Sequence, residues 1–306
     1  MKYASLLVVV FLFQRAYSQS IYSSISGGYQ RIVQNSQAPS NIVNTYHQIS
    51  NPWFWREENV RFTDAMNVDL SFGHFLNKHF GYEISGSYLK PFARSENDGY
   101  TRHTLSGQFY RVSAKIILLV PFEKVDVYSK LGINYAAGIM HYSQAFKNNG
   151  ALPLGFEEST LAYAYTNGGS LGFHLALGTN LHVNKRIAFF AEMSAIYQSF
   201  EPSSGRMTEY TVDGVDQLSY LHDPYFSQIE FGDQSEAYYW NSNDKSQPQK
   251  LYKRNYALGG LGITLGVKYV LWTKKKEELR NELLSKTGLS RNTRNHLEKN
   301  TPLVAR

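Results

Sequence analysis

Few side chains in this chain of 306 residues have the types and spacing that catalysis requires. Glu192 and Ser194 could form a catalytic couple, because a serine hydroxyl is activated by a neighbouring base, and His174 is a further candidate. All three fall on the polar face of the segments that contain them, so a structural salt-bridge and hydrogen-bond network is the favoured interpretation. His103 and His141 have no serine–acid partners visible in the sequence. We therefore expect a protein that is not an enzyme.

The aspartates of the last long loop are the candidates for a metal site. Asp213, Asp216, Asp223 and Asp233 could supply carboxylate ligands, but their spacing matches no EF-hand loop. A solvated acidic loop is the better interpretation. We expect neither a metal nor a cofactor.

The elements that position these side chains follow from the alternation of apolar and polar residues. Residues 256–272 are the most apolar stretch after the N-terminus, but a membrane helix needs about 20 such residues, and Lys268 and four glycines interrupt this run. Taken in steps of two, one face is small or polar. The other face holds Ala257, Leu261, Ile263, Leu265, Val267, Tyr269 and Leu271. This alternation predicts a β-strand.

Seven further segments alternate in the same way, and each is long enough to cross a bilayer as a tilted strand. They are residues 21–29, 60–74, 80–90, 109–118, 126–139, 170–182 and 187–197. Short turns near 74–79, 119–125 and 182–186 alternate with long connections near 30–59, 91–103, 140–169 and 198–255. The pattern predicts an all-β fold, an eight-stranded antiparallel up-and-down transmembrane β-barrel with long extracellular loops and a short periplasmic C-terminal helix or tail.

A soluble β-sandwich or lipocalin-like barrel is the alternative, because such folds also alternate. In this chain the apolar face is uniformly bulky, and the other face combines charges with glycine and serine. An eight-stranded barrel has an interior that side chains can fill, and charges buried there must pair. We expect a charge network in the lumen, in which Asp69, Glu83, Asp126 and Glu192 balance Arg111, Lys115, Lys130 and Lys268.

Aromatic residues on the apolar face fall near the ends of the segments, as in the interfacial girdles of membrane barrels. Near the long loops we expect Tyr29, Phe62, Tyr88, Tyr110, Tyr135 and Tyr197 at the interface. Near the short turns we expect Phe72, Tyr269 and Trp272, together with Phe80 and Tyr82. Two such girdles favour insertion in a membrane.

The N-terminus has the pattern of a secretory signal peptide. Lys2 precedes an apolar run over residues 4–13, and the small residues Ala16 and Ser18 stand before Gln19. The apolar run is too short for a membrane anchor. We expect residues 1–18 to be removed on export.

The C-terminus differs from the rest of the chain in charge. Residues 273–306 contain nine Lys or Arg and four Asp or Glu, whereas the predicted barrel over residues 19–272 is close to neutral. The barrel therefore lacks the excess of basic residues that is typical of nucleic-acid binding. The tail is expected to lie in the periplasm, with Leu279 and Leu283 as a narrow apolar stripe. It is expected to contact either the phosphates of the inner leaflet or a partner, and the alternative is a solvated basic face.

The signal peptide, eight strands, three tight turns and four long loops resemble the OmpA/OmpX-type outer-membrane barrels, particularly forms from Bacteroidota. The resemblance covers residues 19–272 and implies architecture without implying an activity. OmpA proteins carry a peptidoglycan-binding domain after the barrel, for which the 34 residues here are too few. OmpX-like proteins end at the terminal aromatic residue of the last strand, whereas Trp272 continues into a tail.

The long loops are the expected place of function. Trp53, Trp55 and Trp240 lie in them with several tyrosines, and exposed loops rarely keep many aromatic residues unless they pack on each other or on a partner. We expect a structural or accessory subunit that contacts outer-membrane lipid and another outer-membrane or periplasmic protein, with both termini periplasmic and the long loops extracellular. The alternatives are an enzyme acting on the acyl chains of lipid A or phospholipid, a small-solute channel, and loops without a partner.

Overall fold

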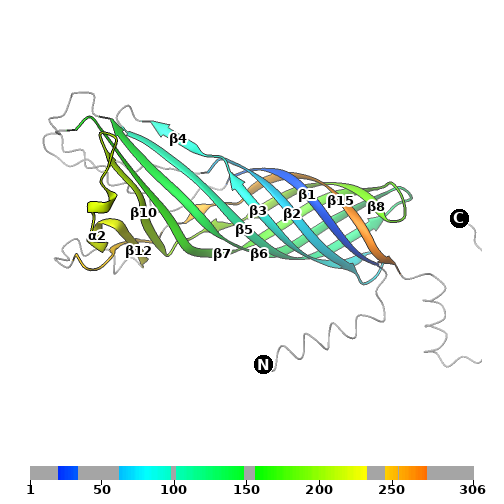
Figure 1. Ribbon diagram of the computed structural model, residues 1–306. Coiled ribbons are helices and arrows are strands. Elements are labelled where there is room, and N and C mark those ends of the chain that lie inside the picture. Colours follow the sequence, from blue (N-terminus) through cyan, green and yellow to red (C-terminus); the bar gives the residue numbers. More distant parts are fainter. Residues whose placement is uncertain are drawn as a thin grey trace, which may run out of the picture.

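Eight antiparallel strands close into a ring in the computed structural model, which describes residues 20–33, 62–97, 101–147, 156–232, 245–253 and 255–273 (Figure 1). In ring order they are β1 (Ser20–Arg31), β2 (Asp64–Phe75), β3 (Phe80–Pro91), β5 (Thr101–Pro121), β6 (Val125–Lys147), β7 (Glu158–His182), β8 (Ile187–Tyr197) and β15 (Gly260–Thr273). The ring closes because β15 pairs with β1, from Ser20 opposite Thr273 to Arg31 opposite Leu261. This confirms the predicted all-β, eight-stranded up-and-down barrel.

The strands point their apolar side chains outward. Ile25, Leu70 and Leu177 are all more than half exposed, while their neighbours Ser24, Ser26 and Ala176 are buried. A strand turns successive side chains to opposite faces, so the alternation seen in the sequence separates an outer wall from a filled interior. A soluble barrel has the reverse arrangement.

Three tight turns close one end of the barrel, which we call the turn end. In the β2–β3 turn, Asn77 Oδ1 accepts hydrogen bonds from the backbone N–H groups of His79 and Phe80, both at 2.8 Å. Asn184 does the same for Arg186 and Ile187 in the β7–β8 turn. These side chains mimic a backbone turn, which is why asparagine suits such positions. The first residue of β1 and the last of β15 lie at this end too.

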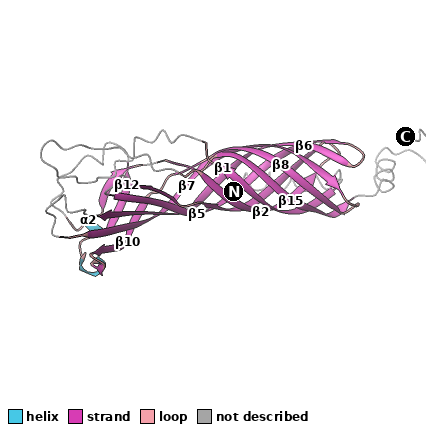
Figure 2. Ribbon diagram, turned by 90° about the horizontal axis from the view of Figure 1, so that it is seen from above, coloured by secondary structure: helices cyan, strands magenta, loops and turns pink. Residues whose placement is uncertain are grey.

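The opposite end of the barrel extends into a sheet (Figures 1 and 2). Strands β5, β6 and β7 contain 21, 23 and 25 residues, against 12 in β1, β2 and β3. Four short strands pair beside their outer halves: β4 (Arg94–Asn97), β10 (Ser204–Val212), β12 (Gln228–Gly232) and β13 (Gln249–Tyr252). Strand β4 pairs with β5, while β10 pairs with β7 and is followed in the sheet by β12 and β13. We call these outer halves and short strands the projecting sheet.

The projecting sheet corrects two of the predicted loops. Much of residues 91–103 and 140–169 is strand, because β5, β6 and β7 remain paired with one another beyond the barrel wall. The segment from Ser159 to Thr166 is rich in Tyr and Thr, which favour strands. Its weak alternation arises because most of its side chains are only partly buried.

The remaining described elements are short. They are β9 (Ser199–Phe200), β11 (Val215–Asp216), β14 (Tyr256–Ala257), the 3-10 helix η1 (Leu218–Tyr220) and the helix α2 (Pro224–Ser227). Within the described ranges, no helix has the length and apolar character to cross a membrane.

The closing strand is shorter than its sequence pattern predicts. Residues 256–257 form the separate strand β14, which pairs with β9, and β15 begins only at Gly260. Ala257 is buried instead of facing outward, and Leu258 beside it is buried as well. The backbone N–H groups of Leu258 and Gly259 donate to the Gln198 carbonyl, both at 2.9 Å, so this segment is held against the end of β8. Alternation alone cannot reveal such a break, because the inward segment is as apolar as the strand that follows it.

Closure of the barrel depends on small residues where β15 meets its neighbours. A Cβ atom built on Gly266 would lie 2.5 Å from the Ile25 carbonyl oxygen and 2.6 Å from a ring carbon of Phe190. We expect Gly266→Ala to destabilise the barrel by roughly 1–3 kcal/mol, the usual range for overpacking. The measurement is the temperature at which the folded, fast-migrating form unfolds on a detergent gel. Gly86→Ala is the matched control, because a Cβ at Gly86 meets nothing within 4 Å; equal effects of the two changes would contradict this account.

Candidate functional site

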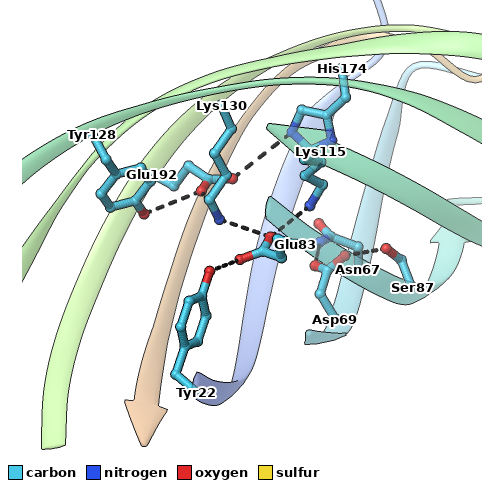
Figure 3. A network of polar contacts seen from close by, with 10 residues as sticks. All are labelled: Tyr22, Asn67, Asp69, Glu83, Ser87, Lys115, Tyr128, Lys130, His174 and Glu192. Atoms are coloured by element: carbon cyan, nitrogen blue, oxygen red, sulfur yellow. Dashed lines mark hydrogen bonds and ion pairs between the residues drawn. The ribbon is translucent and has the colours of Figure 1, made fainter. Parts of the chain in front are cut away.

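A charge cluster occupies the interior of the barrel, centred on Glu83 of β3 (Figure 3). Only 1% of Glu83 is exposed. Its Oε1 atom lies 3.2 Å from the Lys115 ammonium nitrogen and 3.1 Å from that of Lys130, while the Tyr22 hydroxyl donates to Oε2 at 2.6 Å. Both oxygens of this buried carboxylate therefore have strong partners, as its burial requires.

Lys130 joins a second carboxylate to the cluster. Its Nζ atom lies 2.7 Å from Glu192 Oε2, which also accepts a hydrogen bond from Tyr128 at 3.2 Å. The His174 Nε2 atom lies 3.9 Å from Glu192 Oε1. The structure thus brings four of the eight predicted lumen charges, Glu83, Lys115, Lys130 and Glu192, into one chain of ion pairs.

The other four predicted lumen charges lie outside that chain. Lys268 is buried, donates to Asn180 Oδ1 at 2.9 Å and lies over the Tyr22 ring at 4.5 Å. Asp126 pairs with His182 near the turn end, at 2.6 Å. Arg111 is buried, and Asp69, which is half-buried, accepts hydrogen bonds from Asn67 and Ser87.

Sequence reasoning missed the polar residues that complete the network. Tyr22, Tyr128 and Asn180 contact the buried charges through hydroxyl or amide groups. Each stands in the inward phase of its strand, so a signal was available for them in the sequence. Their partners were not predictable, because these side-chain contacts cross the lumen between residues that are 61, 64 and 88 positions apart in the chain.

Apolar layers close both ends of the interior. At the turn end, Tyr22, Ile117, Leu119 and Tyr128 pack together with Phe75. At the other end a larger cluster includes Phe62, Phe109, Phe200 and Leu258. The Phe109 ring centroid lies 5.8 Å from that of Phe62 and 5.0 Å from that of Phe200, in edge contacts that bulky packed rings favour.

A small polar cavity of about 30 Å³ remains between these layers. Such a volume has room for about two water molecules. Asp69, Arg111, Lys115, His174 and Glu192 are among its lining residues. The described interior is therefore largely filled by side chains, with a small polar cavity at its centre.

The catalytic candidates gather in the same cavity without forming a catalytic couple. His174, Glu192 and Ser194 all line it. Within the part of the chain that the structure describes, neither ring nitrogen of His174 has a hydrogen-bond partner, so this histidine does not accept a hydrogen bond from Ser194. His103 lies in the projecting sheet, where its Nδ1 atom is 2.7 Å from the Tyr142 hydroxyl, and His141 lies nearby in β6.

Two aspartates of the last loop accept hydrogen bonds from backbone N–H groups. Asp213 Oδ1 accepts hydrogen bonds from the N–H groups of Glu157 and Glu158, at 2.7 and 2.8 Å, and Asp216 Oδ1 accepts one from Leu218. No group of three or more His, Cys, Asp or Glu side chains among the described residues could hold a metal ion. Asp233 lies outside those residues.

Of the eleven aromatic residues expected at the interfaces, Phe80 and Tyr82 are only partly exposed, and eight are clearly exposed on the outer wall. These are Tyr29, Phe72, Tyr88, Tyr110, Tyr135, Tyr197, Tyr269 and Trp272, each at least a third exposed. Phe62 was expected there and is instead 1% exposed, inside the end of the barrel. The physical reason is that β2 begins at Asp64, so Phe62 precedes the strand and does not follow its alternation.

Several predicted residues lie outside the described part of the chain. They are Trp53, Trp55, Trp240, Leu279 and Leu283, together with the signal peptide over residues 1–18 and nearly all of the tail over residues 273–306. The expectations about them stay predictions.

Comparisons with known proteins are as follows. The chain matches no protein-family model and no curated protein. Among solved structures it is similar to the outer membrane protein OprG from Pseudomonas aeruginosa, with 9% identity and a TM-score of 0.40, over 83% of this chain and 97% of that one. It is also similar to Ail, the attachment invasion locus protein of Yersinia pestis, with 14% identity and a TM-score of 0.29, over 83% of this chain and 99% of that one. The assignment of a barrel rests on the closed ring of strand pairs and not on these distant similarities.

The charge cluster predicts a large cost for neutralising its centre. Glu83→Gln leaves Lys115 and Lys130 with one carboxylate fewer in a buried site, and breaking a buried ion pair costs about 3–5 kcal/mol. We expect the variant to unfold at a clearly lower temperature in detergent. Glu123→Gln, in the exposed β5–β6 turn, is the control and should match the unmodified protein.

A double variant separates charge imbalance from lost packing. Lys115→Met added to Glu83→Gln removes the unpaired cation and should recover part of the stability. If the Glu83→Gln variant unfolds at the same temperature as the Glu123→Gln variant, the cluster does not stabilise the barrel.

Proposed function

We propose that this protein is an OmpA/OmpX-type barrel of the bacterial outer membrane, of the kind found in Bacteroidota, which acts without catalysis as a structural or accessory subunit. The outer wall supports membrane insertion, because large apolar and aromatic side chains cover it from end to end. The exposure of such a wall to water costs free energy, whereas contact with lipid does not. Residues 1–18 would direct export.

The orientation follows from the two ends of the barrel. Membrane barrels have short periplasmic turns and longer extracellular connections. The turn end would therefore face the periplasm together with residues 273–306, and the projecting sheet would stand outside the cell. The termini of the barrel would both be periplasmic.

The projecting sheet is the observation that most directly supports a binding role. It continues three barrel strands that stay paired beyond the wall, with one irregularity between Gly138 and Met140, so it is a continuous sheet rather than a set of separate loops. The chain that follows β10 carries exposed apolar side chains. Val215 of β11, which pairs with β10, and Tyr220 of η1 are 58% and 71% exposed, and Phe226 of α2 is 42% exposed. Exposed apolar side chains that gather on one surface mark sites of protein contact. We infer that the partner is another outer-membrane protein that docks there.

The interior argues against the two rival functions. The apolar layers at both ends and the small central cavity oppose solute flow. The His174 and Ser194 side chains belong to the lumen, away from acyl chains in the bilayer, which opposes a lipid-modifying enzyme.

Reconstitution in planar bilayers tests the sealed lumen. We expect no single-channel conductance steps from the purified protein, because Phe62, Phe109 and Phe200 fill the end of the barrel below the projecting sheet. Reproducible steps of uniform size would contradict the accessory role and favour the channel.

Site-specific photo-crosslinking in intact cells tests the binding role. A photoreactive aromatic residue in place of Tyr220 should give a protein adduct of defined mass. Phe122 is the matched control, because it is an exposed aromatic residue in a turn at the opposite end. Absence of the adduct at position 220, or the same adduct from both positions, would overturn the proposal.

A further inference from the structure

The outer wall has a depression where one small side chain stands between two large ones. Ala195 of β8 is directly paired with Leu175 of β7 on one side and with Leu261 of β15 on the other. All three point outward, so the alanine leaves a hollow between the leucines. Two hollows, of about 420 and 380 Å³, share these three residues and therefore adjoin at Ala195.

We call this depression the wall groove. Its outward lining is apolar, and its principal residues are Leu175, Leu177, Met193, Ala195, Leu261 and Ile263. The lining residues of the neighbouring hollow add Phe173 and Tyr197. An aliphatic chain is the ligand that such a lining fits, because most of the side chains along this outward face are apolar.

A cation stands at the edge of the wall groove. Arg31 lines the larger hollow and is paired directly with Leu261, so it lies two strands from Ala195, about 10 Å away at the usual strand spacing. Arg31 is exposed, and its planar guanidinium matches the oxygens of a phosphate. The groove therefore combines an apolar bed with an anion-binding group at one side.

The groove lies where the barrel wall ends. Ala195 is two residues from the end of β8, Leu261 is the second residue of β15, and Arg31 is the last residue of β1. In the orientation proposed above, this is the headgroup level of the outer leaflet. An acyl chain in the groove would run down the wall from a headgroup beside Arg31.

We propose that the wall groove binds an acyl chain of a phosphorylated lipid of the outer leaflet, with Arg31 donating hydrogen bonds to the phosphate. The proposal rests on the membrane insertion proposed above, and it assigns this wall a specific lipid in place of general contact with the bilayer. Asp64 is the cross-strand neighbour of Arg31, and its Oδ1 atom accepts a hydrogen bond from Tyr29 at 2.6 Å. Its carboxylate weakens phosphate binding, so Asp64→Asn should strengthen it.

Lipid retention in nanodiscs tests the groove. The full chain, reconstituted in phosphatidylcholine with traces of monophosphorylated lipid A or its dephosphorylated form, is analysed by native mass spectrometry. We expect the phosphorylated form to be retained about tenfold more often. Ala195→Leu should fill the groove and reduce retention of both forms, whereas Arg31→Gln should abolish only the preference for phosphate.

Matched variants decide between this site and unspecific lipid contact. Ala191→Leu changes an outward alanine of the same strand that lines neither hollow, and Lys90→Gln removes an exposed cation near the end of β3. Both should behave like the unmodified protein. Equal losses in Ala191→Leu and Ala195→Leu, or an unchanged preference in Arg31→Gln, would overturn the proposal.

A gel of the same samples separates failure of the site from failure of the proposed function. A folded, heat-modifiable band with no selective retention contradicts the lipid site alone. Absence of the folded band after reconstitution contradicts membrane insertion itself. Equal retention of phosphatidylglycerol, which also carries acyl chains and a phosphate, would contradict selection of a lipid of the outer leaflet.

Discussion

The buried carboxylate of Glu83 is the interaction on which the interior of this barrel depends. A wall with apolar side chains on its outside must turn its polar side chains inward, where water cannot solvate them freely. Glu83 is shared by Lys115 and Lys130, and Lys130 also reaches Glu192, so the pairs form a chain across the lumen. Tyr22 and Tyr128 supply the remaining hydrogen bonds and belong to the apolar layer at the turn end. The charges and that layer therefore stabilise each other.

The two parts of the molecule differ in whether their sheet has open edges. Within the barrel every strand has two neighbours, so the ring has no open edge. Beyond the wall, only β5, β6 and β7 continue, and the sheet gains new edges in β4 and β13. Water can solvate such edges, which is why the open sheet occurs only outside the closed ring. The core around Phe109 and Phe200 lies at the junction and joins the two parts.

The regularity of the strands explains which predictions succeeded. Apolar and polar residues alternate through Leu171–Leu181 and Leu261–Leu271, and the structure places the apolar sets outward in both. Phe62 and Ala257 follow the same phase in the sequence and yet lie inside. Both residues stand just outside the strand that the pattern extends, one before β2 and one before β15. At the ends of strands, alternation no longer predicts which way a side chain points, because the backbone there is free to turn.

The sequence by itself determined the class of fold, the eight strands of the barrel, the three tight turns and the division between outer wall and interior. It could do so because a period of two is a local property of the chain. Only the tertiary structure decided which charges meet, where the interior is closed, how far β5 to β7 project and that Ala195, Leu261 and Arg31 share one groove. These features depend on register between strands that are distant in the chain. Register follows from closure of the whole ring, and no single segment contains it.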